Sequence, residues 1–247
     1  MSGEVDAVAV VVPAHDEAAT VEACVRSVIA AARRSRLRLP VSVCVVADRC
    51  TDGTERLARD AGDGFDRFAT VPRARPRPLG DVRNLGVRCA RALLPRVRAE
   101  RLWLLHTDAD GTVPVTWIDD HLRHAFDGAD AVAGRADVQD YSAITVRAQH
   151  RYQEHVRRGE DRFTHSHVYG ANLGVRADVF RAVGGFPEVF TGEDHGLWLK
   201  LAEAGAAVRQ PNDVRVRTSG RTRGRAPGGL AALLRTLTCE GTISSPR

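Results

Sequence analysis

The sequence predicts an α/β fold in which a mixed, mostly parallel central sheet is flanked by helices. Three apolar runs of strand length support this fold class, at residues 7–13, 41–47 and 102–105. None of them alternates polar with apolar residues, which is typical of parallel strands covered on both faces. Segments with helical periodicity lie between these runs, and a repeated strand–helix order favours right-handed βαβ units around a parallel sheet.

Strands and helices alternate through the first half of the chain. The pattern predicts strands at residues 7–13, 41–47, 65–71 and 102–105. It predicts helices at residues 20–34, 55–61 and 80–94. Proline and glycine mark several boundaries, since Pro13 ends the first strand, Gly80 begins the third helix and Pro95 follows its end.

The second half is predicted to add shorter strands and further helices. Its strands are expected at residues 130–138, 169–176, 208 and 214–217. Its helices are expected at residues 114–125, 141–158, 178–183, 193–204 and 230–237. We find no internal repeat and no linker that would separate two independent domains, so one principal domain is expected.

The composition is that of an ordinary globular protein, with 43% hydrophobic and 27% charged residues in a chain of 247. No apolar run approaches the roughly 20 residues that span a bilayer, and the N-terminus shows no signal-peptide pattern. Five cysteines are scattered without a C-x-x-C pair, at positions 24, 44, 50, 89 and 239. This spacing argues against a disulfide framework or a zinc site and predicts a cytoplasmic protein, with peripheral membrane contact left open.

The net charge of +5 comes almost entirely from arginine, because Lys200 is the only lysine. The basic excess is concentrated at residues 73–77 and 215–225. Neither cluster is interleaved with aromatic residues and no nucleic-acid-binding motif is present, so we expect no nucleic-acid partner. Arginines in a chain with an acidic pair favour contact with the phosphates of a small ligand. The alternative is that both clusters are solvated loops.

Two aspartates, Asp108 and Asp110, follow the predicted strand at residues 102–105. In an open α/β sheet, ligands bind at the carboxyl ends of the strands. Two carboxylates in that place repel each other unless a cation lies between them, and Mg²⁺ or Mn²⁺ binds one or two carboxylates together with phosphate oxygens. We therefore expect a metal–diphosphate site here, and the alternative is a solvated turn that caps the next helix.

Five segments, in this order along the chain, resemble the family 2 glycosyltransferases of the GT-A fold. They are residues 10–17 (VVVPAHDE), 47–54 (ADRCTDGT), 80–86 (GDVRNLG), 108–110 (DAD) and 192–195 (GEDH). The second segment departs from the family, which commonly has Gly-Ser where this chain has Arg49 and Cys50. The resemblance extends to about residue 205, and it implies a Rossmann-like GT-A fold and a nucleotide-diphosphate sugar as donor.

The resemblance also implies a set of site residues. Contacts with the nucleotide sugar are expected from Pro13, Ala14, His15, Glu17, Asp48, Arg83, Asp108, Ala109, Asp110 and Asn172. Asp110 and Asp108 are expected to hold Mn²⁺ or Mg²⁺, with His195 as a further candidate ligand. Asp194 is expected to be the general base, and Glu193 to orient either Asp194 or the acceptor.

Elementary chemistry supports these roles. A donor that leaves as a diphosphate needs its charge stabilised, which a metal ion can do. Asp48 suits the hydroxyls of a ribose, and the planar cation of Arg83 suits the nucleotide. Asp194 lies at the start of a predicted helix, where the dipole favours negative charge, and it can accept the proton of an acceptor hydroxyl. A base opposite the leaving group implies inversion; alternatively, Glu193 and Asp194 only cap the helix.

The predicted catalytic domain spans residues 1–220, with a nucleotide-binding half over about 1–111 and an acceptor half over about 112–220. Residues 221–247 form a basic, Arg/Gly-rich tail with a short amphipathic helix, which could be a lid, a membrane contact or disordered. UDP, GDP and dTDP sugars are equal candidates for the donor. The acceptor could be a small molecule or a lipid-linked compound, and the oligomeric state is open.

Two other functions stay open at this point. One is a catalytically silent protein that binds a nucleotide sugar on the same fold, although the intact acidic pairs at 108/110 and 193/194 argue against it. The other is a sugar nucleotidyltransferase. That activity calls for a glycine-rich basic loop after the first strand, whereas this chain has Pro-Ala-His-Asp-Glu at residues 13–17.

Overall fold

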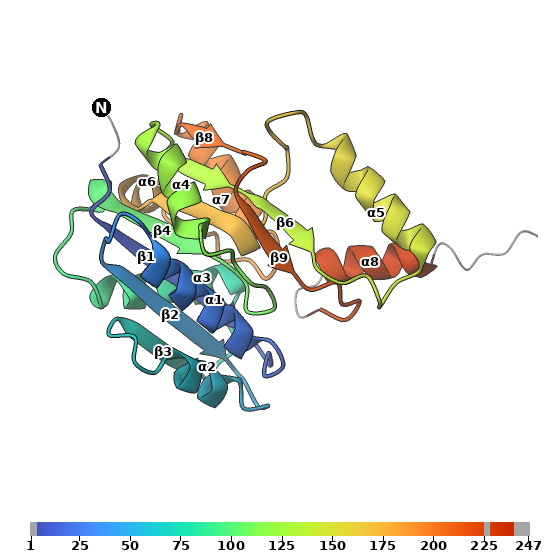
Figure 1. Cartoon of the computed structure of the whole chain (residues 1–247), viewed down its shortest axis with the longest axis horizontal. Coiled ribbons are helices and arrows are strands. Elements are labelled where there is room, and N and C mark those ends of the chain that lie inside the picture. The colour runs from blue at the N-terminus through green and yellow to red at the C-terminus, as the bar shows by residue number, and fades with distance from the viewer. Residues whose placement is uncertain (1–3, 225–227, 240–247) are drawn as a thin grey trace, which may run out of the picture.

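The computed structural model describes residues 4–224 and 228–239, and within them a seven-stranded sheet forms the centre of the molecule (Figure 1). The strand order is β3-β2-β1-β4-β7-β5-β8. The strands are β1 (Ala7–Ala14), β2 (Val41–Asp48), β3 (Phe68–Arg73), β4 (Leu102–His106), β5 (Ala131–Ala133), β7 (Leu173–Arg176) and β8 (Val208–Arg209). β7 runs antiparallel between β4 and β5, and the other pairs are parallel. The sheet is therefore mixed and mostly parallel, as predicted.

β1, β2 and β4 form the buried centre of this sheet. Every residue of these three strands is buried. Their apolar runs are thus confirmed as strands covered on both faces. Because β1 pairs in parallel with both β2 and β4, the carboxyl ends of all three meet at one edge of the sheet.

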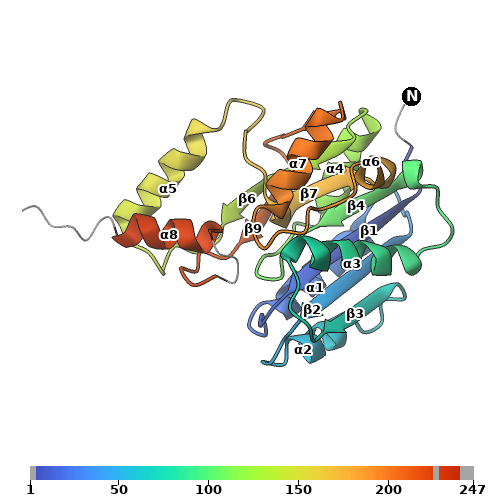
Figure 2. The same cartoon turned by 180° about the vertical axis from the view of Figure 1, so that it is seen from behind.

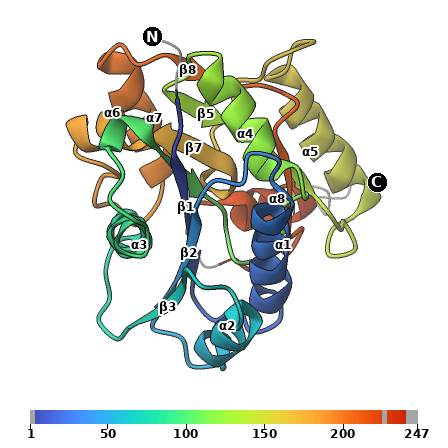
Figure 3. The ribbon, with the colours of Figure 1, turned by 60° about the vertical axis from the view of Figure 1, so that its left-hand side comes forward.

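Helices cover both faces of the sheet (Figure 3). One face carries α1 (Val21–Arg34), α2 (Thr54–Gly62) and α4 (Trp117–Phe126). The other carries α3 (Leu79–Ala92), α6 (Ala177–Ala182) and α7 (Glu193–Glu203), and the short 3-10 helix η1 (Ala99–Arg101) precedes β4. Each set buries its apolar side in a separate core, as amphipathic helices do on a two-faced sheet. Among the described helices, none is long and apolar enough to cross a bilayer.

The prediction of a single strand at residues 130–138 is wrong. The segment divides into β5 and β6 (Arg135–Val138), which lie in different sheets. Gly134 separates them. A Cβ atom at this position would lie 2.3 Å from Asn172 Nδ2 and 2.5 Å from the carbonyl oxygen of Val214, so the close approach requires glycine. β6 pairs in parallel with β9 (Arg215–Thr218), which places the expected edge strand at 214–217 in a small second sheet.

α5 (Val146–Arg158) and α8 (Leu230–Cys239) pack against each other beyond the β6–β9 sheet (Figure 2). Tyr152 and Leu234 are buried in the small core between them. α5 begins at Val146 rather than at residue 141 because Thr145 caps it, its hydroxyl accepting a hydrogen bond from the Ala148 N–H at 3.2 Å. Two parts of the predicted basic tail, 225–227 and 240–247, lie outside the described residues.

Candidate active site

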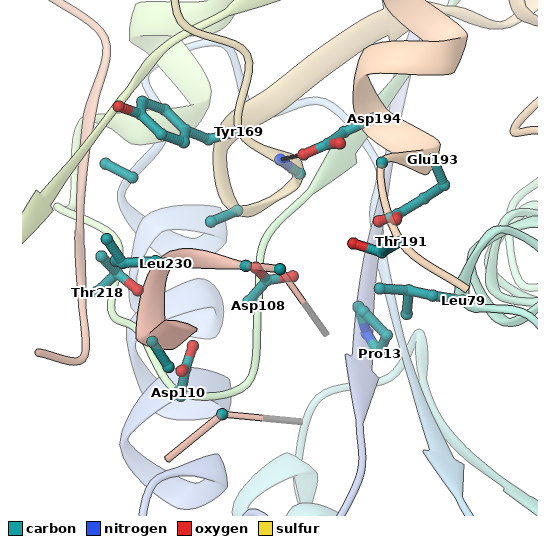
Figure 4. Close-up of a pocket in the computed structure, with 18 of the residues that line it drawn as sticks. Pro13, Leu79, Asp108, Asp110, Tyr169, Thr191, Glu193, Asp194, Thr218 and Leu230 are labelled. Carbon is teal, nitrogen blue, oxygen red and sulfur yellow. Dashed lines mark hydrogen bonds between the residues drawn. The ribbon is translucent and has the colours of Figure 1, made fainter. Parts of the chain in front are cut away.

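A cavity of about 770 Å³ lies at the carboxyl ends of β1, β2 and β4 (Figure 4). This is the edge at which ligands bind in open α/β sheets. The predicted site residues in its wall are Pro13, Ala14, His15, Glu17, Asp48, Arg83, Asp108, Ala109, Asp110, Glu193, Asp194 and His195. The structure therefore brings together residues that are widely separated in sequence, and Asn172 is the one predicted residue that it leaves out of the wall.

Asn172 is fully buried and belongs to η2 (Gly170–Asn172), the 3-10 turn that precedes β7. Its side-chain oxygen accepts hydrogen bonds from Trp117 Nε1 and His121 Nε2, both at 2.9 Å. Its amide nitrogen donates to the carbonyl oxygens of Arg135 at 2.8 Å and Val214 at 3.0 Å. The polar atoms of the side chain are thus engaged inside the protein. The expected contact between Asn172 and the donor sugar is not supported by this geometry.

Asp108 and Asp110 lie in the loop that follows β4, where the sequence places them. Burial, together with the nearby charge of Asp108, raises the pKa of Asp110 to about 6. The guanidinium of Arg221 partly offsets this effect, because it lies 3.0 Å from Asp110 and 2.6 Å from Glu17. Arg221 therefore supplies a positive charge within the carboxylate cluster for which the sequence predicts a metal ion.

The loop that carries Asp110 is fixed against β9. Thr112 and Arg217 exchange two backbone hydrogen bonds of 2.9 Å. A Cβ atom at Gly111 would lie 2.4 Å from the carbonyl oxygen of Arg217, so this approach requires a glycine directly after Asp110. Arg221 follows Arg217 by four residues, and the same contact therefore brings its segment over the acidic cluster.

Arg83 projects from α3 and is only 2% exposed. Its Nη2 donates to Asp108 at 2.7 Å and its Nε donates to Glu193 at 3.0 Å. Burial opposes the charge of Arg83, but Asp108 and Glu193 outweigh burial and raise the pKa above its ordinary value. Burial also raises the pKa of Glu193, while Arg83 opposes that shift. Arg83 thus links the acidic loop after β4 to the first turn of α7.

Asp194 lies in the first turn of α7 and lines the cavity (Figure 4). Gly192 turns the chain into this helix with a φ of 76°, a conformation that favours glycine. Asp194 Oδ2 accepts a hydrogen bond from the Gly170 N–H at 2.8 Å, and Oδ1 accepts one from the His195 N–H at 2.8 Å. Two backbone donors therefore fix the carboxylate in an orientation suited to receiving a proton from a hydroxyl in the cavity.

Two buried polar atoms in the cavity-lining residues have no hydrogen-bond partner within the described chain: Asp48 Oδ1 and Arg83 Nη1. Because buried polar groups are normally paired, these atoms are where contacts with a ligand are expected. Asp48 Oδ2 is already paired with Arg49 at 3.2 Å. Arg49 has a φ of 52°, which explains why glycine suits this position in the family that the sequence resembles.

The acidic cluster fits a cation that arrives together with a phosphate ligand. The described residues hold no preformed group of three or more His, Cys, Asp or Glu side chains that could bind a metal. The exposed His195 is accordingly not assembled with Asp108 and Asp110 into a three-ligand site. Two carboxylates completed by phosphate oxygens are nevertheless a donor set that Mg²⁺ and Mn²⁺ accept, and the cation of Arg221 between Glu17 and Asp110 shows that the cluster takes positive charge.

One wall of the cavity was not predicted. It is formed by α5, the segment at 166–169 and α8, which contribute Tyr152, His155, Ser166, His167, Val168, Tyr169, Leu230, Ala231 and Leu233. These residues form no motif and come from distant segments, so a single sequence offers no signal that joins them. The basic clusters were more informative, since Arg77 from the first and Arg221 from the second both line the cavity.

Comparison with protein-family models matches residues 9–184 to "Glycosyl transferase family 2". A search of curated protein sequences finds no match. Among solved structures, the mannosyltransferase PcManGT from Pyrobaculum calidifontis, in complex with GDP-Man and Mn²⁺, is similar with a TM-score of 0.63 and 17% identity. That similarity covers 97% of this chain and 71% of that one.

Two further structures share the fold. S. aureus TarS 1–349 in complex with UDP-GlcNAc gives a TM-score of 0.65 at 13% identity, over 98% of this chain and 68% of that one. Glucosyl-3-phosphoglycerate synthase from Mycobacterium tuberculosis, in complex with Mn²⁺, UDP and phosphoglyceric acid, gives 0.56 at 17% identity, over 98% and 80%. The family match covers most of the chain and agrees with the fold and the cavity. The chain therefore belongs to glycosyl transferase family 2, an enzyme family that uses nucleotide-sugar donors, and has the GT-A fold.

Proposed function

We propose that the protein is an inverting, metal-assisted glycosyltransferase that moves a sugar from a nucleotide-diphosphate sugar to an acceptor hydroxyl, with Asp194 as general base. One observation carries the proposal. The acidic loop with Asp110 and the fixed carboxylate of Asp194 line a single cavity from different elements, and they lie on opposite sides of it in the view of Figure 4. This arrangement separates a leaving-group side from a proton-accepting side.

The nucleotide side of the cavity supports binding of the donor. Asp48 offers a buried, unpartnered carboxylate oxygen, which suits the hydroxyls of a ribose or the N–H groups of a base. Arg83 offers an unpartnered guanidinium nitrogen beside Asp108. Pro13 and Leu79 add apolar surface to the cavity and lie next to each other in Figure 4. The donors named for two structural relatives, GDP-Man and UDP-GlcNAc, belong to this ligand class.

Asp110, with Asp108 beside it, would hold a divalent metal ion that arrives with the diphosphate. When bound, the metal stabilises the negative charge that develops on the leaving diphosphate. Mn²⁺ is named in two of the related structures. Arg221 already compensates part of the carboxylate charge here, and a guanidinium in this place suits incoming phosphate oxygens.

On the acceptor side, Asp194 receives the proton of the attacking hydroxyl. The Gly170 N–H holds one of its oxygens, so the carboxylate is oriented before the substrate binds. Glu193 is buried against Arg83 and is a positioning residue for Arg83 rather than a second base. Attack from the side of Asp194 on a sugar whose diphosphate lies toward Asp110 inverts the anomeric carbon.

The proposal is tested by incubating the protein with Mn²⁺ and UDP-, GDP- or dTDP-hexoses and measuring release of the nucleoside diphosphate, with water or a panel of hydroxyl compounds as acceptor. We expect release from one nucleotide class only, and NMR of the product should show an inverted anomeric centre. Binding of a donor without any release would favour a silent sugar-nucleotide-binding protein. Release with retention would overturn the assignment of Asp194 as general base.

A further inference from the structure

The two sides of the cavity differ sharply in charge. Among the described residues, the arginines that line it come from the loops after β2 and β9, the segment before α3, and α3 itself. They are Arg49, Arg77, Arg83 and Arg221. Each is paired with a carboxylate, at distances from 2.6 Å for Arg221 and Glu17 to 3.6 Å for Arg77 and Asp81. Arg49, Arg77 and Arg221 pair with carboxylates around the acidic and nucleotide-facing part of the cavity, whereas Arg83 also lies beside Gly170, where a Cβ atom would be 2.5 Å from its Nη2.

The wall formed by α5, the segment at 166–169 and α8 carries rings and apolar side chains. Tyr152 and His155 come from α5, His167 and Tyr169 from the segment before η2, and Leu233 from α8. No lysine or arginine lines this wall within the described parts of these segments. An anionic group placed here would leave water without gaining a lysine or arginine partner from the described parts of these segments, which is unfavourable.

Tyr169 is the ring of this wall most closely tied to the catalytic carboxylate. It directly precedes Gly170, whose N–H donates to Asp194 at 2.8 Å. Its ring stacks on that of His167, with centroids 5.6 Å apart and an interplanar angle of 23°. His167 stacks in turn on His165 at 6.0 Å and 23°. The position of Tyr169 is thus supported by a stack of two further rings.

The two tyrosines of this wall are uncharged at neutral pH. Burial raises the pKa of Tyr169 to about 12 and raises that of Tyr152 above its ordinary value. Behind them, burial lowers the pKa of His165 to about 4, so its imidazole is neutral. Neutral rings of this kind pack well against other rings and against the apolar faces of sugars.

We infer that the acceptor is an uncharged small molecule that carries its reacting hydroxyl on a ring, and that this ring packs against Tyr169 with the hydroxyl directed at Asp194. The inference rests on the proposed function and names the substrate class of its acceptor side. It disfavours acceptors that present a phosphate to this wall, including polyprenyl phosphates and phosphorylated acids, because no lysine or arginine among its described residues would receive them.

Binding of two probes tests the inference: phenyl β-D-glucopyranoside as an uncharged ring compound and 3-phosphoglycerate as an anionic acceptor. Both are titrated into the full chain by ligand-detected NMR, with and without Mn²⁺ and a nucleoside diphosphate. We expect phenyl glucoside to bind and 3-phosphoglycerate not to compete with it. Tyr169→Ala should weaken phenyl glucoside by about fivefold, while Tyr169→Phe, which keeps the ring, should bind as the wild type does.

Two further variants separate a site effect from a folding effect. Phe163→Ala removes a 70% exposed ring outside the cavity and should change nothing. Leu233→Lys adds a cation to the wall and should weaken phenyl glucoside while admitting 3-phosphoglycerate. The inference would be overturned if the wild type bound 3-phosphoglycerate more tightly than phenyl glucoside. It would also be overturned if Tyr169→Ala bound phenyl glucoside as tightly as the wild type does. Nucleotide binding is measured in the same samples. If the nucleotide does not bind, the result counts against the proposed function and not against the inference about the acceptor.

Discussion

Asp194 and Arg83 show how single residues connect the two sides of the site. Asp194 is held by backbone donors from η2 and α7, while Arg83 joins Asp108 to Glu193 through 2.7 and 3.0 Å contacts. A buried arginine between two carboxylates is stable only while both partners stay in place. Arg83 therefore connects the acidic loop to the turn that carries the proposed base.

Replacing Asp194 by Asn should separate catalysis from binding. The amide oxygen of the variant can still accept the Gly170 N–H, while its amide nitrogen gives up the contact with the His195 N–H. The turn before β7 should therefore keep its shape, but the side chain can no longer take up a proton. We expect kcat to fall by about 10²- to 10⁴-fold with little change in nucleotide affinity. Steady-state kinetics and calorimetry check this, with the exposed Asp63→Asn as control. Undiminished turnover would remove Asp194 from the mechanism.

Arg221 should compete with a divalent metal for Asp110. Its guanidinium lies 3.0 Å from that carboxylate and 2.6 Å from Glu17, so Arg221→Gln removes a competing positive charge. We expect Mn²⁺ alone to bind this variant roughly fivefold more tightly, which corresponds to about 1 kcal/mol. Electron paramagnetic resonance of free Mn²⁺ measures the difference. The exposed Arg223→Gln is the matched control, and equal affinities in all three proteins would contradict the competition.

At the scale of elements, Asn172 in the turn before β7 forms hydrogen bonds with α4, with β6 and with Val214, the residue that precedes β9. Asn172→Ala removes four hydrogen bonds and leaves the buried Trp117 N–H without a partner. We expect the free energy of unfolding to fall by about 2–5 kcal/mol, with the nucleotide affinity of the folded protein unchanged. Urea unfolding measures the first quantity and calorimetry the second.

A suitable comparison for this variant is Asn212→Ala. Asn212 also donates to two carbonyl oxygens, those of Asp161 and Thr164, but at a half-buried site. It should cost about 1 kcal/mol or less. If Asn172→Ala were as stable as Asn212→Ala but lost affinity for the donor, the sugar-binding role that the sequence resemblance implies would be restored.

His121 gives α4 a defined response to pH. Burial lowers the pKa of this fully buried residue to about 4, whereas an unfolded histidine has a pKa of about 6.5. Between these values the unfolded state binds more protons, so the free energy of unfolding falls as the pH drops, by up to about 1.4 kcal/mol per pH unit. Above pH 6.5, His121 is neutral in both the folded and the unfolded state, so its titration no longer lowers the free energy of unfolding.

The variant His121→Gln isolates this contribution. Glutamine can still donate to Asn172 Oδ1, which the His121 ring reaches at 2.9 Å, but it does not titrate. Urea unfolding at pH 7, 6 and 5 should show a shallower loss of stability in the variant, by about one proton. Parallel pH profiles would show that His121 is not the titrating group. His106 and His165 are present in both proteins and do not affect the difference.

The elements show where sequence patterns suffice and where they do not. β1, β2 and β4 were predictable because an unbroken apolar run has one simple explanation, burial on both faces. β5 and β6 appeared as one strand, because the contact that breaks them at Gly134 comes from Val214, far along the chain. A sequence pattern also does not show in which direction a side chain points. The resemblance therefore placed Asn172 near the cavity but did not predict that its side chain is engaged inside the protein.

At the scale of the whole molecule, the walls of the cavity are held together by contacts between segments far apart in the sequence. Arg221 reaches Glu17 across 204 positions of sequence, and α8 packs on α5 to complete the ring-lined wall. Motifs of a nucleotide-sugar enzyme predicted the carboxylates that line the cavity but not the place of Arg221 among them. The ring-lined wall has no motif in this sequence, because its residues come from segments that lie far apart along the chain.

The measurement that tests the central claim most directly is thermal unfolding with UDP, GDP and dTDP, each with and without Mn²⁺. A ligand present at 100 times its Kd stabilises the folded state by about 2.7 kcal/mol. We predict that one nucleotide raises Tm, that Mn²⁺ is needed for the full shift, and that Asp110→Ala removes it whereas Asp194→Asn does not. If no nucleotide raises Tm with any metal, or if Asp110→Ala keeps the full shift, the donor site is not where we place it.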